Sequence, residues 1–286
     1  MVYGGNPMHF TKINGLGNDF ITIEIKDGEK CPDFNALAPK WCDRHIGIGA
    51  DGFAVVLPSD KADIRMRIID ADGTEAEMCG NGIRAFCKYV YDTGIVTKTD
   101  FTVETLGGIM HPVITKVEDG KAKLIRVEMG RPEFDPAKVP VVGTEQVIER
   151  PVTVLDRTFT YTAMAIGGVP HIAVFVDNID DVDIAKYGKA IEHCGDFPAL
   201  VNVNFAQLID DHTIKVRTWE RGCGCTLACG TGSTSVAVAG ALTGRTGRSV
   251  DIQLYLGNLH IDWTEDGRVF MEGPAEIGWT GDIPID

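Results

Sequence analysis

The sequence of 286 residues lacks the features that mark several large classes of protein. It has no run of about 18 or more apolar residues, and no basic stretch leads into an apolar one at the N-terminus, so we expect neither a membrane span nor a secretory signal. Acidic residues outnumber basic ones by 41 to 27, which gives a formal net charge of -14. No block rich in Lys, Arg and aromatic residues offsets this charge, which argues against nucleic acid as a partner. We therefore predict a cytoplasmic protein that binds neither membranes nor nucleic acid.

Cysteine is also scarce, with eight residues in the chain. Eight are too few for a disulfide scaffold, and a cytoplasmic chain keeps its thiols reduced, so reactive thiols are allowed. Four cysteines have no distinctive sequence around them, and we expect them to act as small apolar side chains: Cys31, Cys42, Cys87 and Cys194.

A cysteine-glycine motif occurs once in each half of the chain, as Cys79-Gly80-Asn81-Gly82 and as Cys229-Gly230-Thr231-Gly232. Further matches follow both copies in the same order: residues 106–109 with 256–259, 118–121 with 265–268, and 126–129 with 268–271. An ordered internal repeat of this kind is typical of duplicated units. The sequence therefore predicts two homologous domains, with one thiol at an equivalent place in each.

Local patterns predict many strands and few helices. Alternation of apolar and polar residues predicts strands at residues 20–25, 64–69, 101–104 and 215–219. Helices are predicted at residues 37–45, 83–92 and 233–242, each ending at a glycine. Asn81 and Thr231 stand where helix caps are expected, so each motif cysteine should lie just before a helix N-terminus. The polar, proline-containing residues 130–143 predict a crossing between the domains.

Two equivalent thiols suit the inversion of a carbon atom. Racemising an amino acid requires one group that removes the α-proton and another that returns a proton to the opposite face. The pKa of an unperturbed cysteine is about 8.5, and a helix N-terminus can lower it to about 3.5–7.5. The N–H groups of that helix can also hold the α-carboxylate, onto which negative charge spreads when the proton leaves. One motif can thus supply both a base and a carboxylate site.

Other interpretations of the cysteines stay open at this point. A single Cys-Gly-x-Gly before a helix is usually a tight turn with an inert thiol. Cys223, Cys225 and Cys229 could instead hold a metal ion, although zinc sites favour pairs of cysteines separated by two residues. Cys229 could act with His171 as a cysteine hydrolase, which would leave Cys79 without a purpose. The duplication favours the two-thiol interpretation.

Six ordered blocks of sequence resemble the diaminopimelate epimerases that work without pyridoxal phosphate: residues 10–20, 43–52, 72–84, 168–171, 201–203 and 220–233. The resemblance implies an α+β (α/β) fold of two pseudo-symmetric domains, each a curled, mostly antiparallel sheet or barrel around a central helix. The site would lie in the cleft between them. The final strand would return to the first domain, so the domains would be residues 1–126 with 275–286, and residues 127–274.

The resemblance also implies roles for individual residues. Cys79 would be the acid and Cys229 the base in the LL-to-meso direction. Main-chain N–H groups would hold the reacting carboxylate, from Gly80, Asn81, Gly230 and Thr231. Side chains at further positions would bind substrate: Asn18, Asn202, Glu220 and Arg221. His171 and Glu220 would tune the thiols or orient the reacting amine, and neither a cofactor nor a metal is expected.

Structural explanations exist for some of these residues. Asn18 could make a turn within its own loop. Glu220 and Arg221 could form a surface pair, and His171 could be a core histidine.

The chain departs from the family pattern at three positions. Asp70 and Val169 replace asparagines that help to bind the distal end of the substrate, and Cys225 replaces a glutamate. A negative charge at Asp70 would attract a distal ammonium and repel a distal carboxylate. The resemblance implies a diaminopimelate epimerase, whose partner is a small-molecule amino acid substrate. The three departures keep open the alternative of a related racemase that acts on another amino acid, such as histidine or ornithine. Assembly into a homodimer is left open.

Overall fold

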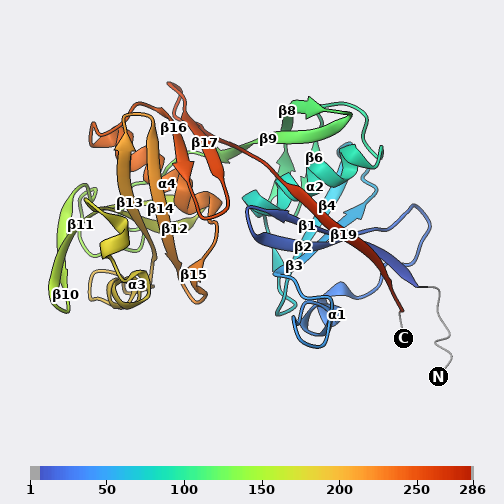
Figure 1. Ribbon diagram of the computed structural model, residues 1–286, viewed down its shortest axis with the longest axis horizontal. Helices are drawn as coiled ribbons and strands as arrows, with labels where there is room; N and C mark the ends of the chain where they lie inside the picture. Colours follow the sequence, from blue (N-terminus) through green and yellow to red (C-terminus); the bar gives the residue numbers. More distant parts are fainter. Residues whose placement is uncertain (1–6, 285–286) are drawn as a thin grey trace. The chain divides into compact units, whose positions relative to one another are not determined.

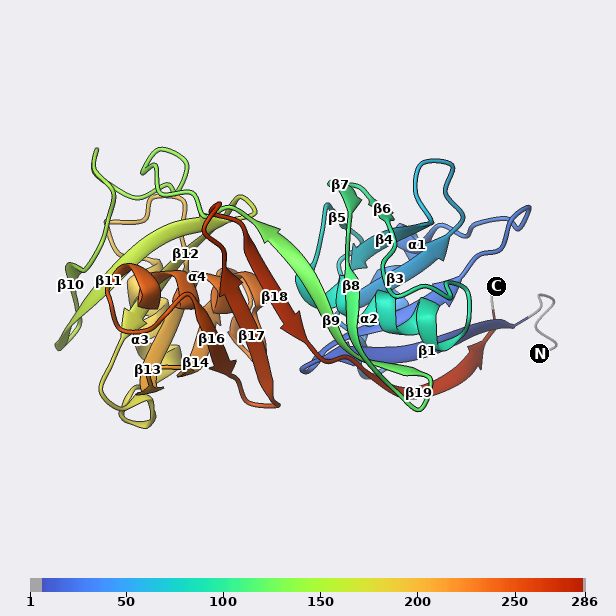
Figure 2. The ribbon, with the colours of Figure 1, turned by 90° about the horizontal axis from the view of Figure 1, so that it is seen from above.

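The computed structural model describes residues 7–284, and the chain divides into two compact units. The first unit comprises the chain up to Val127 together with the segment from Gly273 onward, and the second runs from Glu128 to Glu272. Residues 1–6 and 285–286, which fall in the first predicted domain, lie outside the described residues. Both units combine many strands with few helices, as expected for an α+β fold (Figures 1 and 2).

The first unit is built on an eight-stranded sheet in the order β19-β1-β2-β3-β4-β6-β7, with β5 paired to β4. Its elements are β1 (Met8–Gly15), β2 (Asn18–Glu24), α1 (Phe34–Trp41), β3 (Gly52–Leu57), β4 (Ile64–Asp70), β5 (Glu75–Ala76), α2 (Gly80–Asp92), β6 (Val103–Thr105), β7 (Gly108–Met110) and β19 (Glu276–Ile283). The last strand of the chain pairs antiparallel with the first, β1. Its return to the first unit therefore follows from backbone pairing.

The second sheet has eleven strands in the order β10-β11-β12-β13-β14-β16-β17-β18-β9-β8, with β15 paired to β14. Its elements and the helices that accompany them are β8 (Val113–Glu118), β9 (Lys121–Gly130), β10 (Arg150–Val154), β11 (Arg157–Ile166), β12 (Val169–Phe175), a 3-10 turn (Ile179–Asp181), α3 (Ile184–Glu192), β13 (Asn202–Asp210), β14 (Thr213–Glu220), β15 (Gly224–Thr226), α4 (Gly230–Leu242), β16 (Ser249–Gln253), β17 (Asn258–Trp263) and β18 (Val269–Gly273). Strand β9 carries the chain out of the first unit into the second.

The duplication seen in the sequence is repeated in the strand topology. In the first unit β2 pairs parallel with β3 and β4 pairs parallel with β6, while β3 and β4 are antiparallel. In the second unit β12 and β13, then β14 and β16, repeat these parallel pairs around the antiparallel pair of β13 and β14. Helices α2 and α4 occupy the same place in the two sequences of elements. The prediction of two related α+β domains is confirmed.

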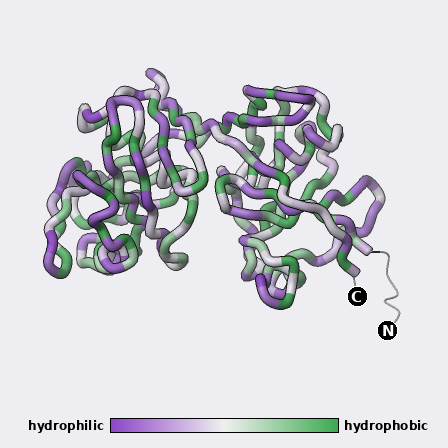
Figure 3. Tube along the Cα trace, in the orientation of Figure 1, coloured by the Kyte–Doolittle hydropathy of each residue, from purple (hydrophilic) through white to green (hydrophobic). Residues whose placement is uncertain are grey.

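Each unit encloses one almost fully buried helix, as expected. In α2 all residues from Asn81 to Val90 are buried, and the helix packs on β1, β2, β3 and β4. Helix α4 consists largely of small and apolar residues, so it has no face suited to water, and it packs on strands β11 to β14, β16 and β17. Both sheets run from one edge strand to another, so they are curled sheets and not closed barrels. Figure 3 shows apolar and polar stretches following one another along the chain, and the strands β3 and β12 are buried through most of their length.

Two local predictions are wrong. The first helix spans Phe34–Trp41 and not residues 37–45, because the Asp33 side chain caps it and Asp43 then accepts the N–H groups of a following turn. Residues 130–143 do not cross between the units but belong to the second one. Val139 and Val141 from this segment are buried in the core of that unit, which explains why it stays there.

None of the helices in residues 7–284 is long and apolar enough to span a bilayer.

Candidate active site

The two motif cysteines are themselves the N-caps of the two buried helices. Cys79 precedes α2 and Cys229 precedes α4, both with extended backbones (φ -136° and -128°). Each sulfur accepts a hydrogen bond from the N–H group of the glycine three residues later, Gly82 or Gly232, at 3.4 Å. The cap positions predicted for Asn81 and Thr231 are therefore wrong by two residues. The sulfurs occupy the place where a Ser or Asp oxygen usually lies.

Asn18 faces the sulfur of Cys79. Its Oδ1 atom lies 3.7 Å from Cys79 Sγ and also accepts the Asn81 side-chain amide at 3.2 Å. Its Nδ2 atom donates to the Asp51 carboxylate at 2.8 Å, which fixes the orientation of the amide because a carboxylate only accepts. Asn18 therefore presents an acceptor to the thiol, and the Cys79 S–H group is the donor. A turn within its own loop does not account for this side chain.

Ion pairs between the β1–β2 hairpin and the segment from α1 to β3 hold Asp51 in place. Arg44 donates to both Asp19 and Asp51, and Lys12 lies 2.7 Å from Asp19. Burial raises the pKa of Asp19, but hydrogen bonds and charges from Arg44 and Lys12 outweigh it and lower the pKa of that carboxyl. Asp51 is thus part of a network that orients Asn18 toward Cys79.

A buried cation supports the start of α2. The Arg84 guanidinium has no exposed surface, and it donates to Gly80 O at 3.0 Å, to Asn81 Oδ1 at 2.9 Å and to Pro274 O at 3.4 Å. Burial lowers its pKa to about 10, so the group stays charged at neutral pH. Its positive charge lowers the pKa of the Cys79 thiol. Arg84 thus forms hydrogen bonds both to the turn next to Cys79 and to Pro274 in the final segment of the chain.

Asp70, at the end of β4, is exposed and acts electrostatically on Cys79. Burial of part of its carboxyl raises its pKa, and the neighbouring charges of Asp72 and Asp51 raise it further. Its own charge raises the pKa of the Cys79 thiol. Asp70 therefore acts on the first thiol through its charge, and its role toward the distal end of a substrate stays a prediction.

In the second unit, Thr231 links the sulfur of Cys229 to His171. The Thr231 hydroxyl lies 3.5 Å from Cys229 Sγ and 2.9 Å from His171 Nε2. His171 has no exposed surface, and burial lowers its pKa to about 3, with a smaller effect from the charge of Arg221. His171 is therefore neutral at physiological pH. It is a core histidine, as the structural explanation proposed, yet it is also joined to the site.

Glu220 and Arg221 do not form a surface pair with each other. Thr226 donates to Glu220 Oε1 at 2.6 Å, and the Glu220 carboxylate acts on Cys229 through its charge and a hydrogen bond. Arg221 is exposed, and its guanidinium donates to Ala199 O at 3.0 Å.

Asn202, at the start of β13, forms hydrogen bonds to β12 and to the turn after β14. Its Nδ2 atom donates to Pro170 O at 2.8 Å, and its Oδ1 atom accepts the Arg221 N–H group at 2.9 Å. The buried Asn202 therefore positions both the segment before His171 and the turn after Glu220.

Both thiols have raised pKa values, which corrects the expectation that a helix N-terminus would lower them. Burial is the main cause for Cys79 and for Cys229, and the Glu220 carboxylate adds to it at Cys229. The glycine N–H groups act in the opposite direction at both sulfurs, as does the Thr231 hydroxyl at Cys229. Desolvation thus outweighs the donors at each helix start.

The alternative chemistries find less support. Among residues 7–284, no group of three or more His, Cys, Asp or Glu side chains is arranged to hold a metal ion. Cys223 and Cys225 are exposed around the short strand β15, whereas Cys229 is buried. His171 contacts the Thr231 hydroxyl, and its lowered pKa makes it a weak base for a cysteine hydrolase.

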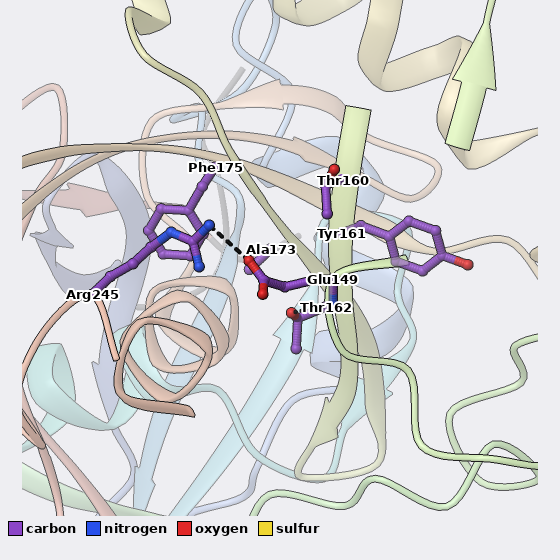
Figure 4. A pocket seen from close by; sticks show the side chains of 7 residues that line it. All are labelled: Glu149, Thr160, Tyr161, Thr162, Ala173, Phe175 and Arg245. Carbon is purple, nitrogen blue, oxygen red and sulfur yellow. Dashed lines mark hydrogen bonds and ion pairs between the residues drawn. The ribbon is translucent and has the colours of Figure 1, made fainter. Parts of the chain in front are cut away.

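Figure 4 shows a small hollow elsewhere in the second unit, where Arg245 pairs with Glu149 at 2.8 Å. Its lining residues are Glu149, Thr160, Tyr161, Thr162, Ala173, Phe175 and Arg245. It contains none of the predicted site residues. Arg245 also lies over the Phe175 ring, 4.7 Å from its centroid, so residues that line the hollow contact one another.

The sequence-based prediction missed Arg84 and Asn204. A signal existed for each: Arg84 is a charged residue within the apolar run of α2, and Asn204 lies two residues after Asn202, on the same face of β13. Asn204 is fully buried and donates toward His171 Nδ1 at 3.3 Å. Both residues act through buried contacts, which become visible only in the folded chain.

Residues 10–134 and 164–278 match the family model described as diaminopimelate epimerase. A diaminopimelate epimerase from Caldanaerobacter subterraneus subsp. tengcongensis is 48% identical over 279 residues, which cover 97% of this chain and 100% of the relative. One from Methanococcus maripaludis strain C6 is 42% identical over 280 residues, with 97% and 100% coverage.

Solved structures share the fold at lower identity. A phenazine biosynthesis protein of the PhzF family from Bacillus anthracis aligns with a TM-score of 0.71 and 17% identity, over 98% of this chain and 100% of that one. A hydroxyproline epimerase from Agrobacterium vitis, with bound trans-4-OH-L-proline, aligns with a TM-score of 0.69 and 16% identity, over 98% and 92%. These likenesses show the fold of two related α+β units.

Proposed function

Because the chain belongs to the diaminopimelate epimerase family, we propose that it interconverts LL- and meso-2,6-diaminopimelate by moving a proton at one α-carbon. The observation that carries the proposal is the pair of cysteines that cap the buried helices α2 and α4 at duplicated positions. The reaction would serve the synthesis of lysine and of peptidoglycan precursors, as the family resemblance implies.

We assign the base to Cys229 and the acid to Cys79 in the LL-to-meso direction. The Cys229 thiolate takes the α-proton as the C–H bond breaks, and the electron pair spreads from the α-carbon into the carboxylate. The Cys79 S–H bond then breaks, and its proton joins the α-carbon on the opposite face. Cys229 ends as a thiol and Cys79 as a thiolate, and the reverse reaction exchanges their roles.

The neighbours of the two sulfurs support this assignment. A glycine N–H group donates to each sulfur alike, so the difference lies in the side chains. Asn18 presents an acceptor to Cys79, which favours the protonated thiol, whereas the Thr231 hydroxyl can donate to the sulfur of Cys229. Hydrogen bonds to the charged form of an ionisable group favour that form. The two equivalent cysteines therefore have different surroundings that suit an acid and a base.

The Glu220 carboxylate explains how binding of the substrate could activate Cys229. Its carboxylate raises the pKa of the Cys229 thiol. An α-ammonium bound beside Glu220 would neutralise that charge and so would favour the thiolate when substrate is present. Glu220 would thus orient the reacting amine and tune the thiol at once.

We propose that the helix starts bind the reacting carboxylate. The first N–H groups of a helix have no acceptor within it, and they carry partial positive charge. Donors of this kind are worth about 2.7–4 kcal/mol each when charge develops on an oxyanion. Gly80, Asn81, Gly230 and Thr231 provide such groups, and the exposed Arg221 suits a carboxylate of the substrate.

The chemistry as proposed needs neither pyridoxal phosphate nor a metal ion, since the thiols and N–H groups carry every step. The cytoplasm is the location that we propose, because both cysteines must stay reduced. The one partner that the mechanism requires is the amino acid substrate.

The proposal is tested by incubating the purified protein with LL-diaminopimelate in heavy water. Two bases that each hold one proton predict that the meso product carries deuterium at its inverted α-carbon, while LL-substrate recovered early keeps its α-hydrogen. Equal labelling of both at early times would indicate a single base. Absence of meso product would refute the proposed activity, and histidine, ornithine and lysine assayed in parallel would identify a different substrate.

A further inference from the structure

A buried chain of hydrogen bonds leads from the interior of the second unit to the sulfur of Cys229. The Thr218 hydroxyl donates to Asn204 Oδ1 at 3.0 Å, and Asn204 Nδ2 lies 3.3 Å from His171 Nδ1. His171 Nε2 lies 2.9 Å from the Thr231 hydroxyl, which lies 3.5 Å from Cys229 Sγ. Thr218, Asn204 and His171 are buried, as is Cys229, while Thr231 is partly exposed. Solvent therefore has little part in choosing the direction of the bonds from Thr218 to His171.

The neighbours of Asn204 fix which way its amide faces. Its Nδ2 atom donates to the backbone carbonyl of Ile172 at 3.0 Å, and a carbonyl can only accept. The second acceptor near this nitrogen, Ser235 Oγ at 3.4 Å, has its own proton committed to Gly232 O at 2.7 Å. The atom that Asn204 turns toward His171 Nδ1 is therefore the donor nitrogen.

Close packing holds Asn204 in this position. A Cβ atom at residue 232 would lie 2.2 Å from Asn204 Oδ1, so the glycine of the second motif makes room for this side chain. In the first unit the corresponding atom at residue 82 would meet the end of the Ile68 side chain at 2.8 Å. An apolar side chain thus packs against the first motif where an amide packs against the second.

The amide decides the tautomer of a neutral histidine. A neutral imidazole has one N–H group and one acceptor nitrogen, and the bond made by one nitrogen fixes the other. With a donor facing Nδ1, that atom must be the acceptor, so the proton lies on Nε2. The Nε2–H group then donates to Thr231 Oγ1, which leaves the threonine hydroxyl proton free to point at Cys229 Sγ.

We propose that Asn204 is a positioning residue that holds His171 in the Nε2–H tautomer and thereby makes the Thr231 hydroxyl a donor to the sulfur of Cys229. Asn204 contacts neither the thiol nor the substrate in this account, and it acts through His171 and Thr231. The catalytic consequence, a better supported thiolate on Cys229, rests on the proposed function. The tautomer itself does not.

Charged groups on other elements act on the hydrogen-bonded chain of Asn204, His171, Thr231 and Cys229, which we call the relay. The Glu220 carboxylate, at the end of β14, opposes thiolate formation at Cys229, while Arg221 disfavours a charge on His171. Burial keeps the ring neutral, since it lowers the pKa of His171 to about 3. The relay therefore keeps one direction throughout the pH range of an ordinary assay.

The test reads the histidine ring nitrogens by NMR in protein labelled with ¹⁵N-histidine, with the His171 signals assigned by their loss in His171→Gln. In the unaltered protein we expect the proton of His171 on Nε2 from pH 5 to 8. In Asn204→Asp, where an acceptor replaces the donor, we expect the proton on Nδ1. Ser235→Ala is the matched control, because it removes another buried neighbour of Asn204 and should leave the proton on Nε2.

A second measurement follows the pH midpoint for alkylation of Cys229, quantified by mass spectrometry at that residue without substrate. Loss of one donor to the thiolate should raise the midpoint by about 0.4–1 pH unit in Thr231→Val, and Thr231→Ser should restore it. Asn204→Asp should raise the alkylation midpoint of Cys229 by a similar amount, measured at a pH where the spectrum shows a neutral His171 ring. The Asn204→Asp, Thr231→Val double variant should raise the midpoint little further than either single variant.

A proton on Nδ1 in the unaltered protein would overturn the inference, and this result needs no variant to fold. An unchanged Cys229 midpoint in Thr231→Val would also overturn it. Neither measurement uses turnover. If the tautomer is the expected one but the protein does not epimerise diaminopimelate, the proposed function is refuted and the relay is not.

Discussion

The side-chain oxygen of Asn18 lies 3.7 Å from the sulfur of Cys79, while the nitrogen of the same amide donates to Asp51 at 2.8 Å. The amide can therefore only accept from the thiol. At the equivalent cysteine of the second unit, the nearest hydroxyl belongs to Thr231, at 3.5 Å. A duplicated motif has thus acquired an acceptor at one sulfur and a potential donor at the other.

Replacing Asn18 should make the Cys79 thiol more acidic. In Asn18→Ala the thiol proton loses its acceptor, and one net hydrogen bond corresponds to about 0.4–1 pKa unit. We expect the pH midpoint for alkylation of Cys79 to fall by that amount in a Cys229→Ala background. Ser59→Ala, on the same unit but bound to Glu104, is the control and should leave the midpoint unchanged. A rise in Asn18→Ala would contradict the assigned direction of the bond.

Acid should destabilise the fold through His171. Its pKa falls from 6.5 to about 3 on burial, so between these values the unfolded state binds a proton that the folded state does not. The stabilising contribution of the neutral ring is complete above pH 6.5 and is lost as the pH falls toward 3. Stability should therefore decline by up to about 1.4 kcal/mol per pH unit from this residue. Urea unfolding from pH 4 to 7 should show a shallower decline in His171→Gln, and an equal slope would contradict the account.

Alanine substitutions at the two motif glycines should differ in cost. A Cβ at residue 232 would lie 2.2 Å from Asn204 Oδ1, in a side chain held by several buried hydrogen bonds, whereas at residue 82 it would meet the terminal methyl group of Ile68, which makes no hydrogen bond, at 2.8 Å. Overpacking in a rigid site costs about 1–3 kcal/mol, while alanine gains up to about 1 kcal/mol over glycine within a helix. Thermal unfolding should thus show a clear loss for Gly232→Ala and a small change for Gly82→Ala. The reverse order would argue against tight packing around Asn204.

Asp70 should bias the choice of substrate. Its charge reaches Cys79, and a negative group beside the first thiol favours a substrate with a distal cation over one with an added distal carboxylate. In Asp70→Asn we expect the kcat/KM for diaminopimelate, relative to that for lysine or ornithine, to rise about two- to fivefold, the size of an interaction between partly exposed charges. Asp72→Asn, whose carboxylate is bound to Thr74, is the matched control. Equal effects in both variants would show that the effect is not specific to Asp70.

The repeated motif and the alternation of residues were enough to predict two homologous domains with many strands and the helices that follow each cysteine, while the α+β fold was implied by the family resemblance. Local signals of this kind act over a few residues, so short segments reveal them. The helix caps were misplaced because a cysteine sulfur took the position that Asn81 and Thr231 were expected to fill. The choice depends on the backbone angles at the cysteine, which residue preferences do not report.

The direction of the thiol pKa shifts could not be predicted from the motif, because it depends on burial by distant segments. Cys229 is 6% exposed, and desolvation there outweighs the helix N–H groups. Arg84 and Asn204 escaped notice for the same reason, since their partners include Pro274 and His171, which lie far away in the sequence. Long-range packing therefore decides the electrostatics of the site, while the sequence motif decides its chemistry.

The most direct test of the two-thiol mechanism compares Cys79→Ala and Cys229→Ala in the interconversion of LL- and meso-diaminopimelate, with Cys31→Ala as the control at an exposed cysteine. Loss of a general acid or base lowers the rate by about 10²–10⁴-fold. We predict a loss of that size in each of the first two variants, with the Cys31→Ala rate unchanged. Epimerisation at the full rate in either Cys79→Ala or Cys229→Ala would contradict the mechanism.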